Sequence, residues 1–224
     1  MNIKAVLFDH DGTIVDSEFA HFEMWRDILL RYGIELSYQG YVDHYAGIPS
    51  NTNARTIVDN YSLNVEPEQL ILAKAESTAK YLSKQAFPLM PGALESIRYF
   101  YDLGLKIGIV TGAGKEGISV TLKKHGLDHY ISVAVSGDDV MNSKPAPDCY
   151  LLAAEKLGLQ SSDCLAIEDT YNGSVSANRA NIKCIGVSAS SQVRELFTDT
   201  IYVCNNLDFA TQWISQNCQL QVSS

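Results

Sequence analysis

A doubly wound α/β fold with a mainly parallel sheet is predicted by three features of this 224-residue sequence. Short apolar runs alternate with segments of helical period, most apolar runs end in polar residues or glycine, and several helical segments end in glycine. Such alternation predicts right-handed strand–helix–strand crossovers, which place helices on both faces of a parallel sheet. Hydrophobic residues make up 46% of the chain and charged residues 19%, so the composition supports a buried core and excludes disorder, collagen and coiled coil.

The first strand is expected from Ile3 to Phe8, where an apolar run ends in a polar cluster. The alternation then stops, because residues 17–86 contain two amphipathic helical stretches and no convincing strand between them. We interpret residues 17–86 as a helical cap domain inserted after the first strand, and residues 1–16 and 87–224 as the core domain. Pro88 and Pro91 mark the return to the core.

The rest of the core resumes the alternation of strands and helices. Further strands are expected at Leu105–Gly112, His129–Gly137, Asp163–Asp169 and Ile182–Ser188, with a shorter one beginning at Ile201. Helices are expected at Pro91–Gly104, Lys115–Gly126, Ala146–Gly158 and Thr170–Asn181. Ligands of open α/β sheets bind at the carboxyl ends of the strands, so the polar residues at these ends are the candidates for chemistry.

Charge and composition exclude several classes of partner. The chain has 17 Lys and Arg against 26 Asp and Glu, a net charge of −9, which would repel nucleic acid. The apolar run at the start of the sequence is too short for a signal segment or a membrane span, so we expect no membrane partner and a cytoplasmic location. The five cysteines lack metal or disulfide spacing, and we expect them to be reduced core residues.

Two carboxylates, Asp9 and Asp11, follow the first strand in the sequence DHDGT. A turn in which an aspartate bonds the backbone accounts for one acid but not for two before Gly-Thr. Carboxylates this close repel, so the pair implies either a hard metal ion, for which Mg²⁺ would serve, or one raised pKa. A second pair, Glu168 and Asp169, ends another predicted strand and could converge on the same ion.

Two weaker signals suit a phosphate group. Thr111 and Gly112 end a strand just before a helix, and they offer a hydroxyl and an unhindered backbone N–H. Lys144 lies in a loop before a helix and could reach the same pocket. Each has a plain alternative, a turn for the Thr-Gly pair and a solvated side chain for the lysine. His10 should point away from the metal, as a buried structural histidine.

Taken in order, these four strand-end signals resemble the haloacid dehalogenase superfamily, in its branch of capped phosphatases and β-phosphoglucomutase-like phosphomutases. The resemblance spans essentially the whole chain, and DHDGTIVDSE, KPAPD and IEDTYNG carry it. It implies a Rossmann-like core with a helical cap, a Mg²⁺ cofactor and a small phosphorylated metabolite as partner. The reaction it implies is hydrolysis of a sugar or polyol monophosphate. We expect a monomer or a weak homodimer.

The resemblance also implies roles for the strand-end residues. Asp9 is similar to the nucleophile that forms an aspartyl-phosphate, and Asp11 to the general acid and base. Mg²⁺ would be held by the Asp9 carboxylate, the Asp11 backbone carbonyl and Asp169, with Glu168 as a ligand or a partner of the ligands. The groups that would neutralise charge on the phosphoryl oxygens are Thr111, Gly112 and Lys144.

In the cap, the resemblance points to four residues: His21, Trp25, Gly47 and Ser50. His21 and Trp25 share one helix face, which is equally typical of packing within the cap. Sugar-phosphate mutases place an arginine soon after the glycine, whereas Ser50 stands here and Arg55 lies further on. This favours hydrolysis over a mutase reaction. The alternatives are a β-phosphoglucomutase-like isomerase, and a non-catalytic module that binds phosphate groups.

Overall fold

The computed structural model describes residues 1–220 and divides the chain into two compact units. The core unit consists of Met1–Asp16 and Pro88–Ser224, and the inserted unit of Ser17–Phe87. The boundary expected from the sequence is therefore corrected by one residue. Phe87 belongs to the inserted unit, where its ring is buried and stacks on that of Tyr81 with 4.9 Å between centroids.

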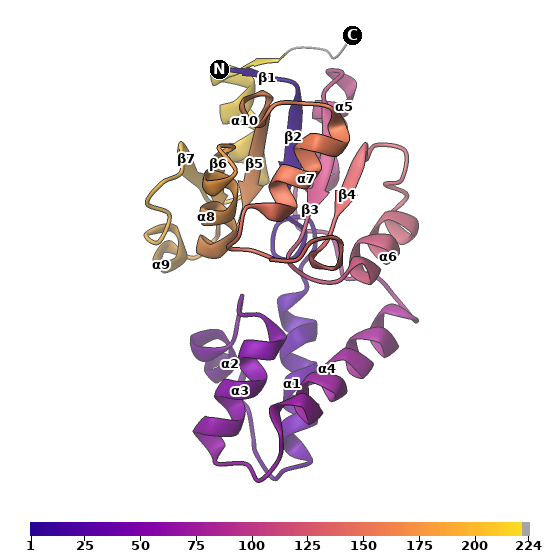
Figure 1. The fold of residues 1–224 in the computed structure, drawn as a ribbon, viewed down its shortest axis with the longest axis vertical. Coiled ribbons are helices and arrows are strands. Elements are labelled where there is room, and N and C mark those ends of the chain that lie inside the picture. Colours follow the sequence, from indigo (N-terminus) through magenta and orange to yellow (C-terminus); the bar gives the residue numbers. More distant parts are fainter. Residues whose placement is uncertain (221–224) are drawn as a thin grey trace. The chain divides into compact units, whose positions relative to one another are not determined.

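The core unit contains a six-stranded sheet in the order β4-β3-β2-β5-β6-β7, and every pair of neighbouring strands is parallel (Figure 1). Its strands are β2 (Ala5–Phe8), β3 (Lys106–Val110), β4 (Val133–Val135), β5 (Cys164–Glu168), β6 (Lys183–Val187) and β7 (Tyr202–Cys204). The predicted doubly wound α/β fold is confirmed. The chain builds outward from β2 on one side and then from β5 on the other, so the topological switch point lies between these two strands.

The first apolar run is divided, which the sequence pattern does not predict. Asn2–Ile3 (β1) pairs in parallel with Gln219–Leu220 (β8) in a separate two-stranded sheet, while β2 enters the main sheet. Lys4 joins the two strands. Its amide donates to the Asp163 carbonyl at 2.8 Å and its Nζ to the Asp163 carboxylate at 3.3 Å, next to the start of β5.

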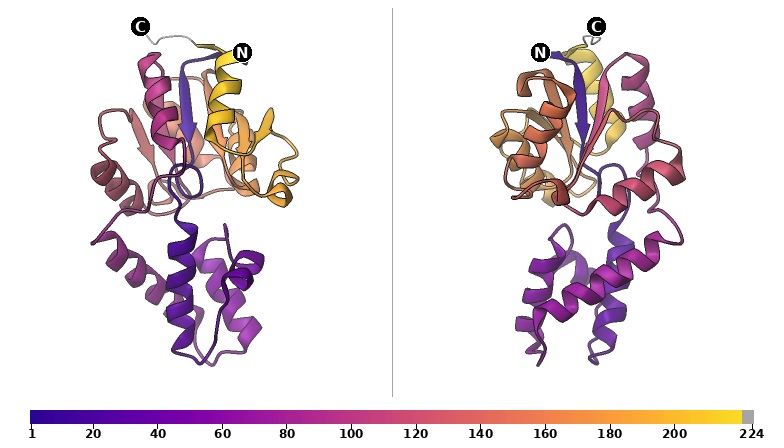
Figure 2. Two further views of the ribbon diagram at one scale, coloured as in Figure 1. Left: turned by 180° about the vertical axis from the view of Figure 1, so that it is seen from behind. Right: turned by 45° about the vertical axis from the view of Figure 1, so that its right-hand side comes forward.

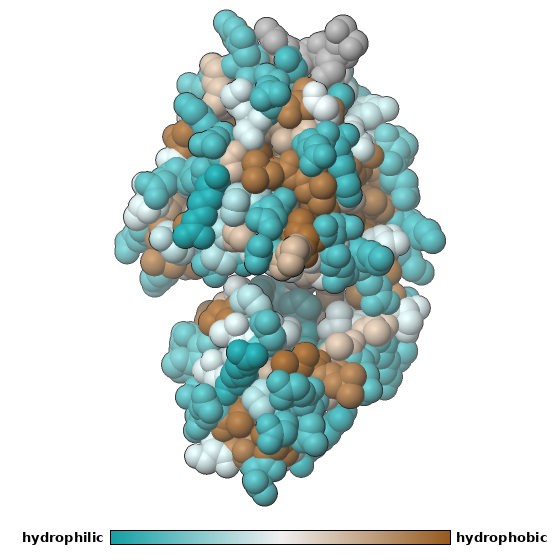
Figure 3. Space-filling view, viewed as in Figure 1, coloured by the Kyte–Doolittle hydropathy of each residue, from teal (hydrophilic) through white to brown (hydrophobic). Residues whose placement is uncertain are grey.

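Helices cover both faces of the main sheet (Figures 1 and 2). Helices α5 (Ala93–Asp102) and α10 (Leu207–Asn217) contact each other and one face, whereas α7 (Asp148–Leu157) and α8 (Tyr171–Arg179) contact each other and the opposite face. The connections between the strands also contain α6 (Lys115–His125), α9 (Ser191–Arg194) and two 3₁₀ turns, η1 (Gly137–Asp139) and η2 (Ser161–Asp163). On the face that shows α7, hydrophobic residues gather over the middle of the core unit and hydrophilic residues surround them (Figure 3).

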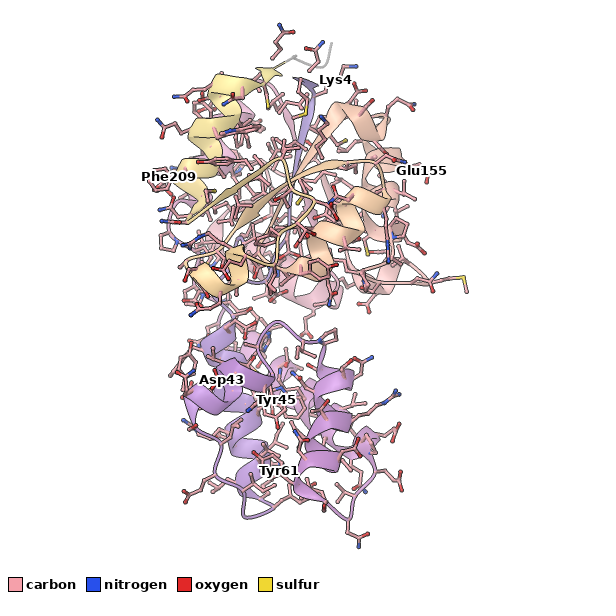
Figure 4. All side chains as sticks on the ribbon, turned by 90° about the vertical axis from the view of Figure 1, so that its left-hand side faces the viewer. Lys4, Asp43, Tyr45, Tyr61, Glu155 and Phe209 are labelled. Carbon is pink, nitrogen blue, oxygen red and sulfur yellow. The ribbon has the colours of Figure 1, made fainter. Side chains whose placement is uncertain are left out.

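The inserted unit is entirely helical in its regular structure, with α1 (Glu18–Leu30), α2 (Tyr38–His44), α3 (Ser50–Tyr61) and α4 (Pro67–Leu82). The sequence pattern predicts only α1 and α4. All four helices contribute to one hydrophobic cluster, which contains Trp25, Tyr41, Ile57 and Leu70. Tyr45, in the loop after α2, is 2% exposed and lies among these helices (Figure 4). The inserted unit therefore has a hydrophobic core of its own.

No helix among residues 1–220 combines the length and the apolar character that a membrane span requires.

The five cysteines are free thiols, and all but Cys218 are buried. Burial raises the pKa of Cys164 to about 12 and that of Cys204 to about 11, which suppresses the reactive thiolate. We therefore expect a disulfide reagent to modify Cys218 first in the native protein and the other four only after denaturation. The test counts the protein thiols that react with and without denaturant. Rapid reaction of several thiols in the native protein would contradict the prediction.

Candidate active site

Two acidic residues follow neighbouring strands at the switch point. Asp9 directly follows β2, and its amide donates to the Ile167 carbonyl of β5 at 2.9 Å, so the pairing of the strands fixes its backbone. Glu168 is the last residue of β5, and Asp169 comes next. Asp9 is 6% exposed and Glu168 is fully buried. The fold thus concentrates negative charge at the edge where ligands of such sheets bind.

Carboxylate oxygens of Asp9, Glu168 and Asp169 all lie within 4.8 Å of one another. Two glycines make the room for them. Gly12 has a φ of 87°, and a Cβ there would collide with the Asp169 carboxylate, while a Cβ at Gly173 in α8 would collide with that of Glu168. The Thr13 hydroxyl donates to Asp169 Oδ1 at 3.4 Å. Glycines near the two acidic pairs therefore allow the backbone to approach the carboxylates closely.

Lys144 is the cation that holds the cluster together. Its Nζ donates to Asp9 Oδ1 at 2.5 Å, to Glu168 Oε1 at 2.6 Å and to the Val110 carbonyl at 2.8 Å. These bonds use all three donors of an ammonium group, so Lys144 must exchange one of them to bond a phosphate oxygen. Its first role in this structure is to orient Asp9.

Electrostatic effects of burial and of the lysine oppose each other at these acids. Burial raises the pKa of Glu168 to about 7, although the charge of Lys144 works in the other direction. Burial also raises the pKa of Asp9, again against the effect of Lys144. For Lys144 itself, burial favours the neutral amine, but the two carboxylates outweigh it and raise its pKa above the usual value. The lysine thus stays positively charged.

The residues present fit a Mg²⁺ ion. Glu168 Oε1 accepts bonds from Lys144 and from the Tyr150 hydroxyl, at 2.6 Å each, whereas Oε2 is buried without a hydrogen bond in the described part of the chain. A buried carboxylate oxygen needs a partner, and oxygen donors are the ligands that Mg²⁺ prefers. One lysine also leaves an excess of negative charge in a cluster of three carboxylates. Asp9, Glu168 and Asp169 are the side chains that would hold the ion.

The second aspartate of the motif, Asp11, lies beside the loop that follows β3. The Thr111 hydroxyl donates to Asp11 Oδ2 at 3.4 Å and accepts from the Ala113 amide at 3.0 Å. Gly112 is exposed, its carbonyl accepts from the Ser143 hydroxyl at 3.0 Å, and the loop leads directly into α6. The structure therefore brings Asp11, Thr111 and Gly112 to the edge that carries Asp9, and the Ser143 contact links this loop to the one that carries Lys144.

The four candidate residues of the inserted unit lie in different environments. Trp25 is 1% exposed in the hydrophobic cluster, a position that favours packing over substrate contact. His21 Nδ1 lies 3.1 Å from Lys74 Nζ, and its ring meets that of Phe87 edge-on. Gly47 has a φ of 68° in the loop between α2 and α3, and Ser50 begins α3 on the surface. Their roles in binding stay predictions.

Comparison with known proteins identifies the family. The model of the haloacid dehalogenase-like hydrolases matches residues 6–187, which includes the motifs at the ends of β2, β3 and β5. The chain belongs to this family. Its membership makes the chain a hydrolase, and it confirms the resemblance on which the sequence interpretation depends.

Two curated relatives of this haloacid dehalogenase-like hydrolase carry the name of a phosphatase. "Putative phosphatase YhcW" of Bacillus subtilis (strain 168) is 35% identical over 82% of each chain. Fructose-1-phosphate phosphatase YqaB of Escherichia coli (strain K12) is 30% identical over 81% of this chain and 95% of its own. A solved β-phosphoglucomutase from Clostridium difficile shares the fold, with a TM-score of 0.78 at 22% identity over 96% of both chains. The two curated relatives support a phosphatase, and the solved structure supports the fold.

Sequence reasoning does not find two polar residues of these units. The Tyr150 hydroxyl donates to Glu168 from the buried face of α7. A tyrosine on an apolar helix face could have indicated this, because a buried tyrosine hydroxyl usually has a polar partner. Lys74 is 3% exposed on α4, one turn after the buried Leu70 and bonded to the Thr78 hydroxyl at 3.0 Å. A lysine at core spacing marks such a position, because lysine is rarely buried without partners.

Proposed function

We propose that this hydrolase is a Mg²⁺-dependent phosphatase that cleaves a small sugar or polyol monophosphate through an aspartyl-phosphate on Asp9. The observation that carries the proposal is the buried Asp9 carboxylate, held by Lys144 at the switch point and two residues from a second acid. A carboxylate fixed in this way, beside a group that can exchange protons, is what nucleophilic phosphoryl transfer requires.

In the first half of the reaction, an Asp9 oxygen attacks phosphorus and the bond from phosphorus to the sugar oxygen breaks. Asp11 gives its proton to the departing oxygen, which leaves as an alcohol. Thr111, the Gly112 amide and Lys144 offset charge on the phosphoryl oxygens. When bound by Asp9, Asp169 and Glu168, Mg²⁺ supplies further positive charge for the phosphoryl group.

In the second half, Asp11 takes a proton from a water molecule. The water oxygen attacks phosphorus, the bond between phosphorus and Asp9 breaks, and inorganic phosphate leaves while the Asp9 carboxylate is restored. We infer that the inserted unit acts as a cap that reads the leaving group, with His21, Gly47 and Ser50 as candidates. The serine at the position where mutases place an arginine supports hydrolysis over return of the phosphoryl group.

The test is phosphate release from a panel of fructose 1-phosphate, hexitol phosphates, other sugar phosphates and nucleoside monophosphates, with Mg²⁺ and with EDTA. We expect release from a few sugar or polyol phosphates that requires Mg²⁺. Conversion of β-glucose 1-phosphate to the 6-phosphate without release would replace the proposal by a mutase reaction. Absence of both reactions would overturn the enzymatic proposal and favour a phosphate-binding module.

A further inference from the structure

His10 is a buried histidine between the two aspartates of the motif. Its side chain is 1% exposed and lies against α6, where Gly117 and Thr121 stand one turn apart on the same face. A Cβ at Gly117 would lie 3.5 Å from His10 Cε1, so the ring packs directly on that turn of the helix. The expectation that His10 is buried is met, and the position of the ring brings both of its nitrogens to polar partners.

Each ring nitrogen has a partner of a different kind. His10 Nε2 lies 2.9 Å from the Thr121 hydroxyl, which is itself fully buried, and Nδ1 lies 3.1 Å from Asp11 Oδ2. An ionised carboxylate only accepts hydrogen bonds, so the proton of a neutral ring belongs on Nδ1. Nε2 then accepts from the Thr121 hydroxyl. Asp11 thereby fixes the tautomer, and the contact with Thr121 fixes the orientation of the ring.

The contact with Asp11 distinguishes the two oxygens of that carboxylate. The donors on His10 and on Thr111 both point to Oδ2, at 3.1 and 3.4 Å. An oxygen that accepts these bonds is a poor place for a proton, so a proton exchanged by Asp11 belongs on Oδ1. A leucine at position 10 would fill the same space without this effect. The pair of bonds therefore gives His10 a function that packing alone does not require.

We propose that His10 is a positioning residue for Asp11, anchored by Thr121, which holds the carboxylate so that Oδ1 faces the oxygen of the leaving group. The inference rests on the proposed phosphatase function and deepens it. Asp11 is the acid that protonates a sugar alkoxide, and its efficiency depends on the orientation of the proton that it gives.

Two substitutions separate the two bonds of the ring. The amide nitrogen of asparagine matches the place of Nδ1, so His10→Asn keeps a donor toward Asp11. The amide nitrogen of glutamine matches the place of Nε2, so His10→Gln keeps the contact with Thr121, whose hydroxyl then accepts, and loses the donor to Asp11. The readout is kcat/KM for p-nitrophenyl phosphate and for the sugar phosphate that the wild-type enzyme cleaves fastest in the panel above.

The two substrates differ in their need for an acid. p-Nitrophenolate leaves without protonation, whereas a sugar alkoxide does not, and kcat/KM reports the steps up to loss of the leaving group. We expect His10→Gln to lower kcat/KM for the sugar phosphate by about 10- to 100-fold, but that for p-nitrophenyl phosphate by less than about threefold. His10→Asn should keep the ratio of the two kcat/KM values close to that of the wild type.

An equal loss for both substrates, or a ratio that both variants leave unchanged, would overturn the proposal and make His10 a packing residue. Hydrolysis of neither substrate by the wild-type enzyme would instead reject the phosphatase function itself. If His10→Gln does not fold, the anchor offers a second pair. Thr121→Val should shift the substrate ratio in the same direction, and Thr121→Ser, which keeps the hydroxyl, should restore it.

Discussion

Replacement of Asp9 by asparagine is expected to lower kcat by at least about 10⁴-fold, because the amide does not attack phosphorus as a carboxylate does. The fold should be retained, since asparagine keeps an oxygen that can accept the bond from Lys144. KM should change much less than kcat. Steady-state phosphate release measures the loss, and mass spectrometry of acid-quenched enzyme should show a phosphate adduct on the wild type only.

Asp163→Asn is the matched control for this prediction. The same chemical change is made in the same unit, but next to the start of β5, where Asp163 contacts Lys4 rather than the acidic cluster. Its kcat should equal that of the wild type. Asp9→Asn with more than about a tenth of wild-type kcat would contradict the covalent mechanism, because an amide cannot replace the carboxylate that bonds phosphorus at so small a cost.

The strand ends of the core could be predicted because their signals are local. Each of the runs that became β3, β5 and β6 is a short apolar segment followed by polar residues, and parallel pairing brings such ends to one edge. Asp9, Glu168 and Asp169 therefore lie together as the pattern indicates. The position of the switch point could not be predicted in this way, because it depends on the order of the strands in the sheet.

Other features depend on contacts between distant segments, which a single pattern does not reveal. β1 exists because it meets β8, more than 200 residues later, so Ile3 could be assigned only to the strand that follows it. Helix α2 is short, and both α2 and α3 are mostly polar outside a few core positions, so their place in the insertion follows from packing in a cluster shared with α1 and α4. Tyr150 was hidden for the same reason, since its partner Glu168 is on another element.

The largest effect on stability is expected for Lys144→Met. The substitution keeps the apolar length of the side chain but removes the cation that Asp9 and Glu168 share. The lysine side chain is 8% exposed and that of Glu168 is fully buried. Without the lysine, each of the two acids must either keep a buried charge that no cation offsets or take up a proton, and both cost stability at neutral pH. We expect the free energy of unfolding to fall by about 3–5 kcal/mol at neutral pH, as it does when one partner of a buried ion pair is removed. Urea unfolding measured in EDTA tests this.

The loss of unfolding free energy in Lys144→Met should be smaller at low pH than at high pH. Burial already raises the pKa of Glu168 to about 7, and without Lys144 it rises further. Below that pKa the folded variant carries a neutral Glu168 and no longer buries its charge. A group whose pKa is raised on folding favours the folded state at low pH and loses this contribution as pH rises, so the deficit should be smaller at about pH 5 than at about pH 8.

Lys4→Met is the control, because it makes the same chemical change in a longer and partly exposed ion pair. Lys4 and Asp163 lie 3.3 Å apart with side chains 35% and 23% exposed, and loss of such a pair should cost less than about 1 kcal/mol. Excess Mg²⁺ should stabilise Lys144→Met against urea, since a cation that binds only the folded carboxylates adds to the free energy of unfolding. If Lys144→Met loses no more unfolding free energy than Lys4→Met, the buried acids are already neutral in the folded wild-type protein. Lys144 then does not hold Asp9 as a carboxylate.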